Sequence, residues 1–98
     1  MTLPIVFLDE ARAEFDESAD WYQRQRAGLG AEFIARVQDV LDGISAMPRM
    51  HPVIYQDIRR AVVKKFPFTV LYQVEVDYLL IVAVFHSKRD PSIWKSRV

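Results

Sequence analysis

Hydrophobic residues change their spacing halfway along the chain. Ala11, Phe15, Ala19 and Tyr22 recur every three or four residues, which predicts an amphipathic helix over residues 9–26 with Asp9 as its N-cap. A second apolar stripe before Pro48 predicts another helix over residues 31–47. The members of this second stripe are Phe33, Ile34, Val37, Val40, Leu41 and Ile44. Because only a short glycine-containing break separates the two helices, they are expected to form an antiparallel hairpin.

The remaining segments alternate with the period of a β-strand. Residues 3–8 predict a short strand, and Pro4 places it at a sheet edge because proline has no amide hydrogen. Strands are also predicted over residues 58–64, 68–75 and 79–85, with a loop over 50–56 and one helical turn within 91–98. The strand over 79–85 is apolar on both faces, which is typical of a central strand. The sequence therefore predicts a single α+β domain over residues 1–98, of order β-α-α-β-β-β, with the helical hairpin packed on a small, mostly antiparallel sheet.

Composition limits the chemistry that the chain can perform. The absence of cysteine removes disulfides and thiolate nucleophiles and fits a reducing cytoplasm. His51 and His86 are the only histidines, and neither has ligands at metal-binding spacing, so neither a metal nor a cofactor is expected. No leader peptide and no membrane-spanning run is expected.

The two halves of the chain carry opposite charge, although the formal net charge is zero. Residues 1–48 contain nine acidic and four basic side chains, whereas residues 49–98 contain nine basic and four acidic ones. This split predicts that anionic partners approach the basic half.

The order of several short motifs resembles the RelE/ParE superfamily of toxins from bacterial type II toxin–antitoxin systems. The first half contributes Ala11, Phe15, Ala19, Trp21, Tyr22, Gly28, Leu29, Gly30, Phe33, Ile44 and Pro48. The second half contributes Arg59, Arg60, Lys65, Phe66, Pro67, Phe68, Tyr72, His86, Arg89, Asp90, Pro91, Trp94 and Arg97. The resemblance implies a small fold of the kind predicted above. It also implies a short antitoxin whose C-terminal segment wraps around the toxin, in a heterotetramer or larger assembly.

The resemblance leaves two kinds of target, because RelE-like members cut messenger RNA on the ribosome and ParE-like members bind DNA gyrase. Several RelE-like nucleases have an arginine three residues before the tyrosine that matches Tyr72, but this chain has Thr69 there. Residues 94–98 also contain no terminal tyrosine or histidine, and Arg60 is a poor base because it stays protonated. These departures favour a cytoplasmic ParE-like inhibitor of DNA gyrase, neutralised by its antitoxin. A metal-independent endoribonuclease and a non-toxic or degenerate antitoxin-binding module remain alternatives.

The candidate site residues form three groups. Target binding is expected from Arg59, Arg60, Lys64, Lys65, Arg89, Trp94 and Arg97, and antitoxin binding from Trp21, Tyr22 and Phe33. Charge reversal at Arg89 or Arg97 is expected to abolish toxicity and leave the fold intact. A nuclease site would combine His86 as the acid–base group with Arg60, Lys88 and Arg89 as phosphate-binding cations.

Structural roles remain open for the same residues. His86 fits a hydrogen-bonded strand end, and Trp94 fits a cover over the sheet. Arg59 and Arg60 are adjacent in a strand and point to opposite faces, so one of them is expected to pair with Glu14 or Glu17.

Overall fold

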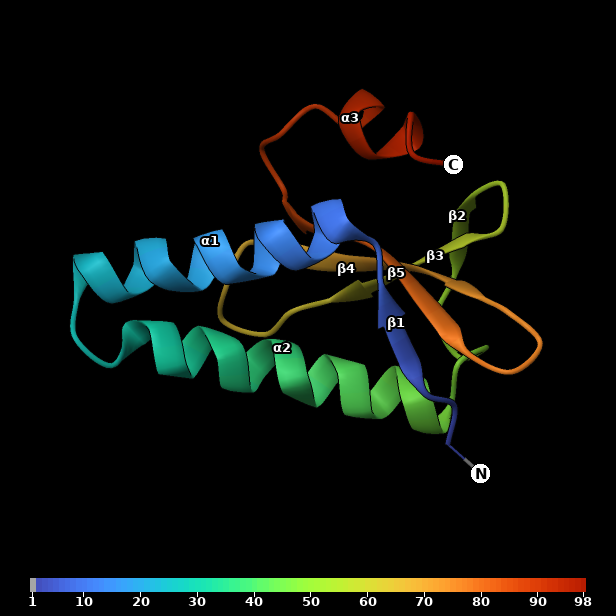
Figure 1. The fold of residues 1–98 in the computed structure, drawn as a ribbon, viewed down its shortest axis with the longest axis horizontal. Coiled ribbons are helices and arrows are strands. Elements are labelled where there is room, and N and C mark those ends of the chain that lie inside the picture. The colour runs from blue at the N-terminus through green and yellow to red at the C-terminus, as the bar shows by residue number, and fades with distance from the viewer. Residues whose placement is uncertain (1) are drawn as a thin grey trace.

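The computed structural model describes residues 2–98 as a helical hairpin packed on one face of a five-stranded sheet (Figure 1). In chain order the elements are β1 (Ile5–Phe7), α1 (Asp9–Gln25), α2 (Leu29–Ala46), β2 (Val53–Tyr55), β3 (Ile58–Val62), β4 (Phe68–Val74), β5 (Leu79–His86) and α3 (Ser92–Lys95). The strand order is β1-β5-β4-β3-β2, with β1 parallel to β5 and the other neighbours antiparallel. The α+β class, the hairpin and the edge position of β1 are therefore confirmed.

Three details differ from the sequence-based expectations. Asp9 lies inside α1, whose N-cap is Leu8, so its carboxylate complements the positive helix end from the first turn. The second helix begins at Leu29, two residues before the predicted start. The expected loop over 50–56 contains β2, whose three residues are too few to show a period and pair irregularly with β3.

A glycine turn joins α1 to α2, and one glutamine of α1 caps the start of α2. Gly28 has a φ of 91°, a left-handed conformation that suits glycine. The Gln23 side-chain oxygen accepts hydrogen bonds from the backbone amides of Gly28 and Gly30, at 3.1 and 3.2 Å. These bonds satisfy amides that a helix start leaves without intrahelical partners. A side chain of α1 therefore caps α2.

Substituting Gly30 by alanine is expected to cost about 1–3 kcal/mol, because a Cβ there would lie 2.7 Å from the Ala19 carbonyl oxygen and 2.9 Å from the Gln23 Cβ. Gly43 is the matched control, since it lies on an exposed part of α2 and its Cβ would contact nothing within 4 Å. Gly43→Ala is expected to stabilise the protein by about 0.5–1 kcal/mol through helix propensity. Urea denaturation of both variants measures this difference, and equal midpoints would contradict close packing at Gly30.

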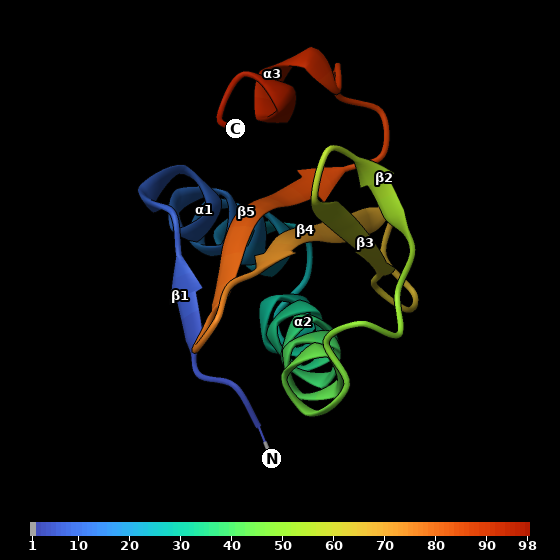
Figure 2. The ribbon, with the colours of Figure 1, turned by 90° about the vertical axis from the view of Figure 1, so that its right-hand side faces the viewer.

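The sheet lies between the helical hairpin and α3 (Figure 2), and an apolar core fills the space on each side of it. The larger core lies between the helical hairpin and the sheet, and its fully buried side chains include Phe33, Ile44, Tyr72, Leu79 and Ile81. The smaller core lies between the sheet and α3, and it contains Ile58, Leu71, Val82, Ala83, Phe85 and Trp94. β5 contributes to both cores, which explains why its sequence is apolar on both faces. Among the helices of residues 2–98, none has the length and apolar character needed to cross a membrane.

Candidate functional site

A groove of about 500 Å³ lies between α1 and the end of β5. Its lining residues are Glu14, Glu17, Ser18, Trp21, Tyr22, Phe68, Val84, His86 and Arg89. The lining is mostly apolar, and its charged members are Glu14, Glu17 and Arg89. Such a groove suits an amphipathic segment of another protein, because apolar contact supplies affinity and the charges supply orientation.

The two adjacent aromatic residues of α1 have different environments. Trp21 is 51% exposed and meets the ring of Tyr22 edge to face, with the ring centroids 5.1 Å apart. Tyr22 is half-buried against Phe33, Phe66 and Phe68, and burial raises the pKa of its hydroxyl. Trp21 is therefore the exposed aromatic side chain of the groove. Phe33 was also expected to contact the antitoxin, but it is fully buried in the larger core and cannot do so directly.

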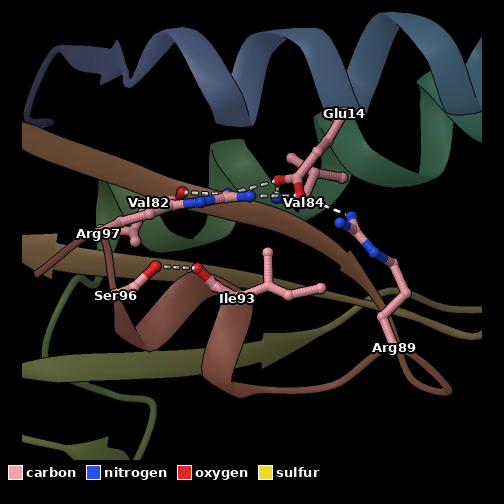
Figure 3. A network of polar contacts seen from close by, with 7 residues as sticks. All are labelled: Glu14, Val82, Val84, Arg89, Ile93, Ser96 and Arg97. Atoms are coloured by element: carbon pink, nitrogen blue, oxygen red, sulfur yellow. Dashed lines mark hydrogen bonds and ion pairs between the residues drawn. The ribbon is translucent and has the colours of Figure 1, made fainter.

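One carboxylate joins the groove to the C-terminal segment (Figure 3). Glu14 accepts two hydrogen bonds from Arg97, both at 2.9 Å, and one from Arg89 at 2.8 Å. Glu14 also accepts a hydrogen bond from the backbone amide of Val84 at 3.2 Å. Arg97 donates a further hydrogen bond to the backbone carbonyl of Val82 at 3.1 Å. The side chains of Glu14 and Arg97 are only 11% and 10% exposed, whereas that of Arg89 is 42% exposed. Hydrogen bonding to Glu14 raises the pKa of Arg97 and keeps it protonated.

A β-bulge explains why this network forms on β5. Leu71 of β4 pairs with Ala83, and the next residue, Tyr72, pairs with Ile81, so Val82 has no partner in β4. A bulge leaves backbone groups outside the ladder of hydrogen bonds. Arg97 reaches the Val82 carbonyl and thereby supplies the missing partner.

The structure corrects the expected roles of two residues near the C-terminus. Trp94 is 4% exposed and belongs to the smaller core, where its ring meets Tyr55 edge to face. It covers the sheet, as one interpretation of the sequence allowed, and its ring is too buried to form part of an exposed target-binding surface. Arg97 is held in the network with Glu14, so its guanidinium is not part of an exposed cationic surface.

The two strand arginines lie on opposite faces of the sheet, as expected. Arg59 pairs across the sheet with Tyr72 of the larger core, and Arg60 with Leu71 of the smaller one. Arg59 donates to the backbone carbonyls of Arg49 and His51, at 3.1 and 2.6 Å. The expected pairing of either arginine with Glu14 or Glu17 is therefore wrong. Arg59 fixes the segment before β2, while Arg60 stays exposed.

Four exposed cations lie in two turns that are joined at one end of the sheet. Lys64 and Lys65 lie in the turn between β3 and β4, and Lys88 lies in the turn after β5. The Ser87 amide donates to the Pro67 carbonyl at 2.8 Å and joins these turns. Arg89 follows Lys88 and also lines the groove. We call Lys64, Lys65, Lys88 and Arg89 the basic end; it reaches the groove at Arg89, whereas Lys64 lines a second pocket beside α2.

His86 lies at the strand end that leads into the basic end. Its Nδ1 accepts a hydrogen bond from the Lys88 amide at 3.0 Å, and its ring packs on Phe68 with centroids 5.1 Å apart. Because His86 pairs with Phe68, it lies on the helical face of the sheet, opposite to Arg60. The expected nuclease set of His86, Arg60, Lys88 and Arg89 is therefore not brought together on one face.

Within residues 2–98, no group of three His, Cys, Asp or Glu side chains is arranged to hold a metal ion.

The fold and the groove define a small α+β protein with a mostly apolar groove that adjoins exposed cations. Residues 5–91 match the model of the family described as the ParE toxin of type II toxin–antitoxin system, parDE. The chain belongs to this family of toxins. No curated protein sequence matches it.

A solved structure described as the chromosomal ParDE TA system from P. aeruginosa has a similar fold, with a TM-score of 0.65 and 15% sequence identity. The similarity covers 89% of this chain and 98% of that chain. At this level of identity the likeness supports the fold, including the hairpin packed on a mixed sheet.

Sequence reasoning missed two features of the site. Gln23, which caps α2, gave no signal because a lone glutamine near a helix end has many possible roles. Glu14 was considered as an ion-pair partner, but for the strand arginines. Its position directly before the buried Phe15 is the one signal that could have placed it against the sheet.

Proposed function

We propose that this toxin arrests bacterial growth by binding DNA gyrase through its basic end, and that a cognate antitoxin neutralises it by occupying the groove. The observation that carries the proposal is the position of Arg89, which lines the groove and also belongs to the basic end. An antitoxin segment in the groove would cover Arg89 and stand beside the neighbouring lysines. Binding of antitoxin and of target would then be mutually exclusive.

Charge supports an acidic surface on the target. The exposed cations of the basic end raise the local concentration of anionic groups and speed association, an effect that salt weakens. Gyrase binding also requires no catalytic group, which fits a site where Arg60 and His86 lie on opposite faces of the sheet. The proposal places the protein in the cytoplasm, where gyrase acts, in a heterotetramer or larger assembly with its antitoxin.

Reversing charge in the basic end is expected to reduce toxicity strongly. The variant Lys64→Glu/Lys88→Glu should lose most growth arrest and retain wild-type thermal stability, because both side chains are exposed. The matched control is Arg12→Glu/Arg49→Glu, which changes the net charge equally at exposed positions outside the basic end and the groove. Induced expression in a bacterium without antitoxin measures growth, filament formation and the DNA-damage response.

The same experiment separates the alternative functions. Filaments with a DNA-damage response support gyrase poisoning. Arrest with rapid, codon-linked cutting of transcripts would replace the proposal with ribosome-dependent nuclease activity. Normal growth with folded protein would indicate a non-toxic or degenerate antitoxin-binding module. Equal toxicity of the two charge-reversal variants would contradict a role for the basic end.

A further inference from the structure

The second pocket, beside α2, has a volume of about 270 Å³ and shares no lining residue with the groove. Three basic side chains line it from three parts of the chain. They are Arg36 of α2, His51 of the segment before β2 and Lys64 of the turn after β3. Asp39, also of α2, is the one carboxylate that residues 2–98 place in the lining, and the other lining residues are apolar or glycine. Basic groups therefore outnumber acidic ones around a small apolar hollow.

The basic side chains of this pocket have no acidic partner within residues 2–98. Neither Arg36, His51 nor Lys64 forms an ion pair there. Asp39 lies three residues after Arg36, a spacing at which helical side chains often pair, but these two do not. Arg36 is also half-buried, so protein atoms replace part of its hydration. A cation in this position attracts an anion more strongly than one in open solvent.

The backbone that carries His51 is fixed by two side chains of the sheet. The Tyr72 hydroxyl donates to the Pro48 carbonyl at 2.7 Å, and Arg59 donates to the carbonyls of Arg49 and His51 at 3.1 and 2.6 Å. The His51 ring also meets the Tyr72 ring edge to face, with centroids 6.3 Å apart. These contacts order the segment before any ligand binds, which lowers the entropic cost of binding.

We propose that this pocket binds a tetrahedral oxyanion, either free phosphate or the phosphate group of a small phosphomonoester. The planar guanidinium of Arg36 can donate two parallel hydrogen bonds to phosphate oxygens, while Lys64 and His51 supply further positive charge. The volume lies just below the usual range for drug-sized ligands, which limits the ligand to a phosphate with a small substituent. Lys64 also belongs to the basic end, so a bound anion would neutralise one of its four cations.

His51 makes this binding dependent on pH. Histidine is the side chain whose ordinary charge change falls between pH 5 and pH 8. The other charged or titratable groups around His51 are Arg36, Asp39, Lys64, Arg59 and Tyr72. Lowering the pH through this range is expected to add one positive charge to the pocket and to strengthen the binding of an anion.

Titration of the purified protein with sodium sulfate, followed by nuclear magnetic resonance of the backbone amides, tests this inference. Sulfate keeps its two charges across this pH range, whereas phosphate does not, and sodium chloride holds the ionic strength constant. Saturable shifts are expected at the amides of Ala61 and Val62, with a dissociation constant in the millimolar range. Affinity should be about threefold higher at about pH 5.5 than at about pH 8. His51→Gln should remove this pH dependence.

Two charge variants on α2 are expected to act in opposite directions. Arg36→Gln should weaken sulfate binding about tenfold, as for a lost hydrogen bond to a charged group. Asp39→Asn should strengthen it about threefold, because it removes a nearby like charge. The control Arg24→Gln makes the same charge change as Arg36→Gln at an exposed position of α1 outside the pocket, and it should leave the affinity unchanged.

Ribose 5-phosphate distinguishes the two sources of the oxyanion. Tighter binding than that of sulfate at the same pH would indicate a phosphomonoester, and equal binding would indicate free phosphate. Shifts no larger than those caused by chloride, shifts away from the pocket, or weaker binding in Asp39→Asn would overturn the inference. Binding is measured without target or antitoxin, so its failure would leave the proposed function untouched, and a harmless protein that binds sulfate would remove only the toxicity.

Discussion

Replacing Arg97 by glutamate is expected to destabilise the fold by about 4 kcal/mol, because it breaks a largely buried ion pair and leaves Arg89 as the one cation bound to Glu14. The substitution also sets two carboxylates against each other beside Glu14 and removes the donor to the Val82 carbonyl. Small domains lose about 4–8 °C of melting temperature per kcal/mol, so the melting temperature should fall by roughly 20 °C.

This expectation corrects the idea that charge reversal at Arg97 tests target binding with the fold intact. A non-toxic Arg97→Glu variant would reflect unfolding as much as a lost contact. Lys88→Glu is the matched control, since it reverses one exposed charge in the neighbouring turn and should change stability by no more than about 0.5 kcal/mol. Thermal denaturation by circular dichroism measures both variants. An Arg97→Glu protein that melts like the wild type would show that the network with Glu14 does not hold the C-terminal segment.

Truncating Phe33 to alanine is expected to cost about 3–5 kcal/mol, the usual range for a buried phenylalanine. Phe33 is fully buried, and its ring lies within 4.9 to 6.1 Å, centroid to centroid, of four other aromatic rings. These rings belong to Phe15, Tyr22, Phe66 and Phe68. The truncation would leave a cavity between the hairpin and the sheet.

The adjacent Ile34 provides the control for this truncation. It is 46% exposed on the same helix, so Ile34→Ala should cost about 1 kcal/mol or less. Urea denaturation gives both free energies of unfolding. Equal losses for the two variants would mean that Phe33 is not part of the core, and its assignment as an antitoxin contact would return.

The sequence predicted the elements whose patterns are long. The helical stripes and the strand over 79–85 contain enough residues to show a period, and they fixed the class and the layer order. β2 was missed because three exposed or half-exposed residues give no pattern and depend on pairing with β3. The bulge at Val82 was missed because an apolar run on both faces hides a change of register.

The candidate site was predicted less well, because residue type does not reveal burial. Arg89 and Arg97 look alike in the sequence, but one is 42% exposed and the other 10%. Both bind Glu14, which lies 75 and 83 residues away along the chain, but Arg97 binds it twice and also donates to the Val82 carbonyl. Trp21 and Trp94 differ in the same way, since tertiary packing alone decides which ring is covered.

The bond between Glu14 and Arg97 also has a consequence for kinetics. It joins residues 83 positions apart, so closing that loop requires a large loss of chain entropy unless the sheet has already formed. We therefore expect the bond to form late in folding and to be largely absent from the transition state. Interactions of this kind slow unfolding without speeding folding. The network around Glu14 is then expected to affect how long a folded molecule persists, more than how quickly it forms.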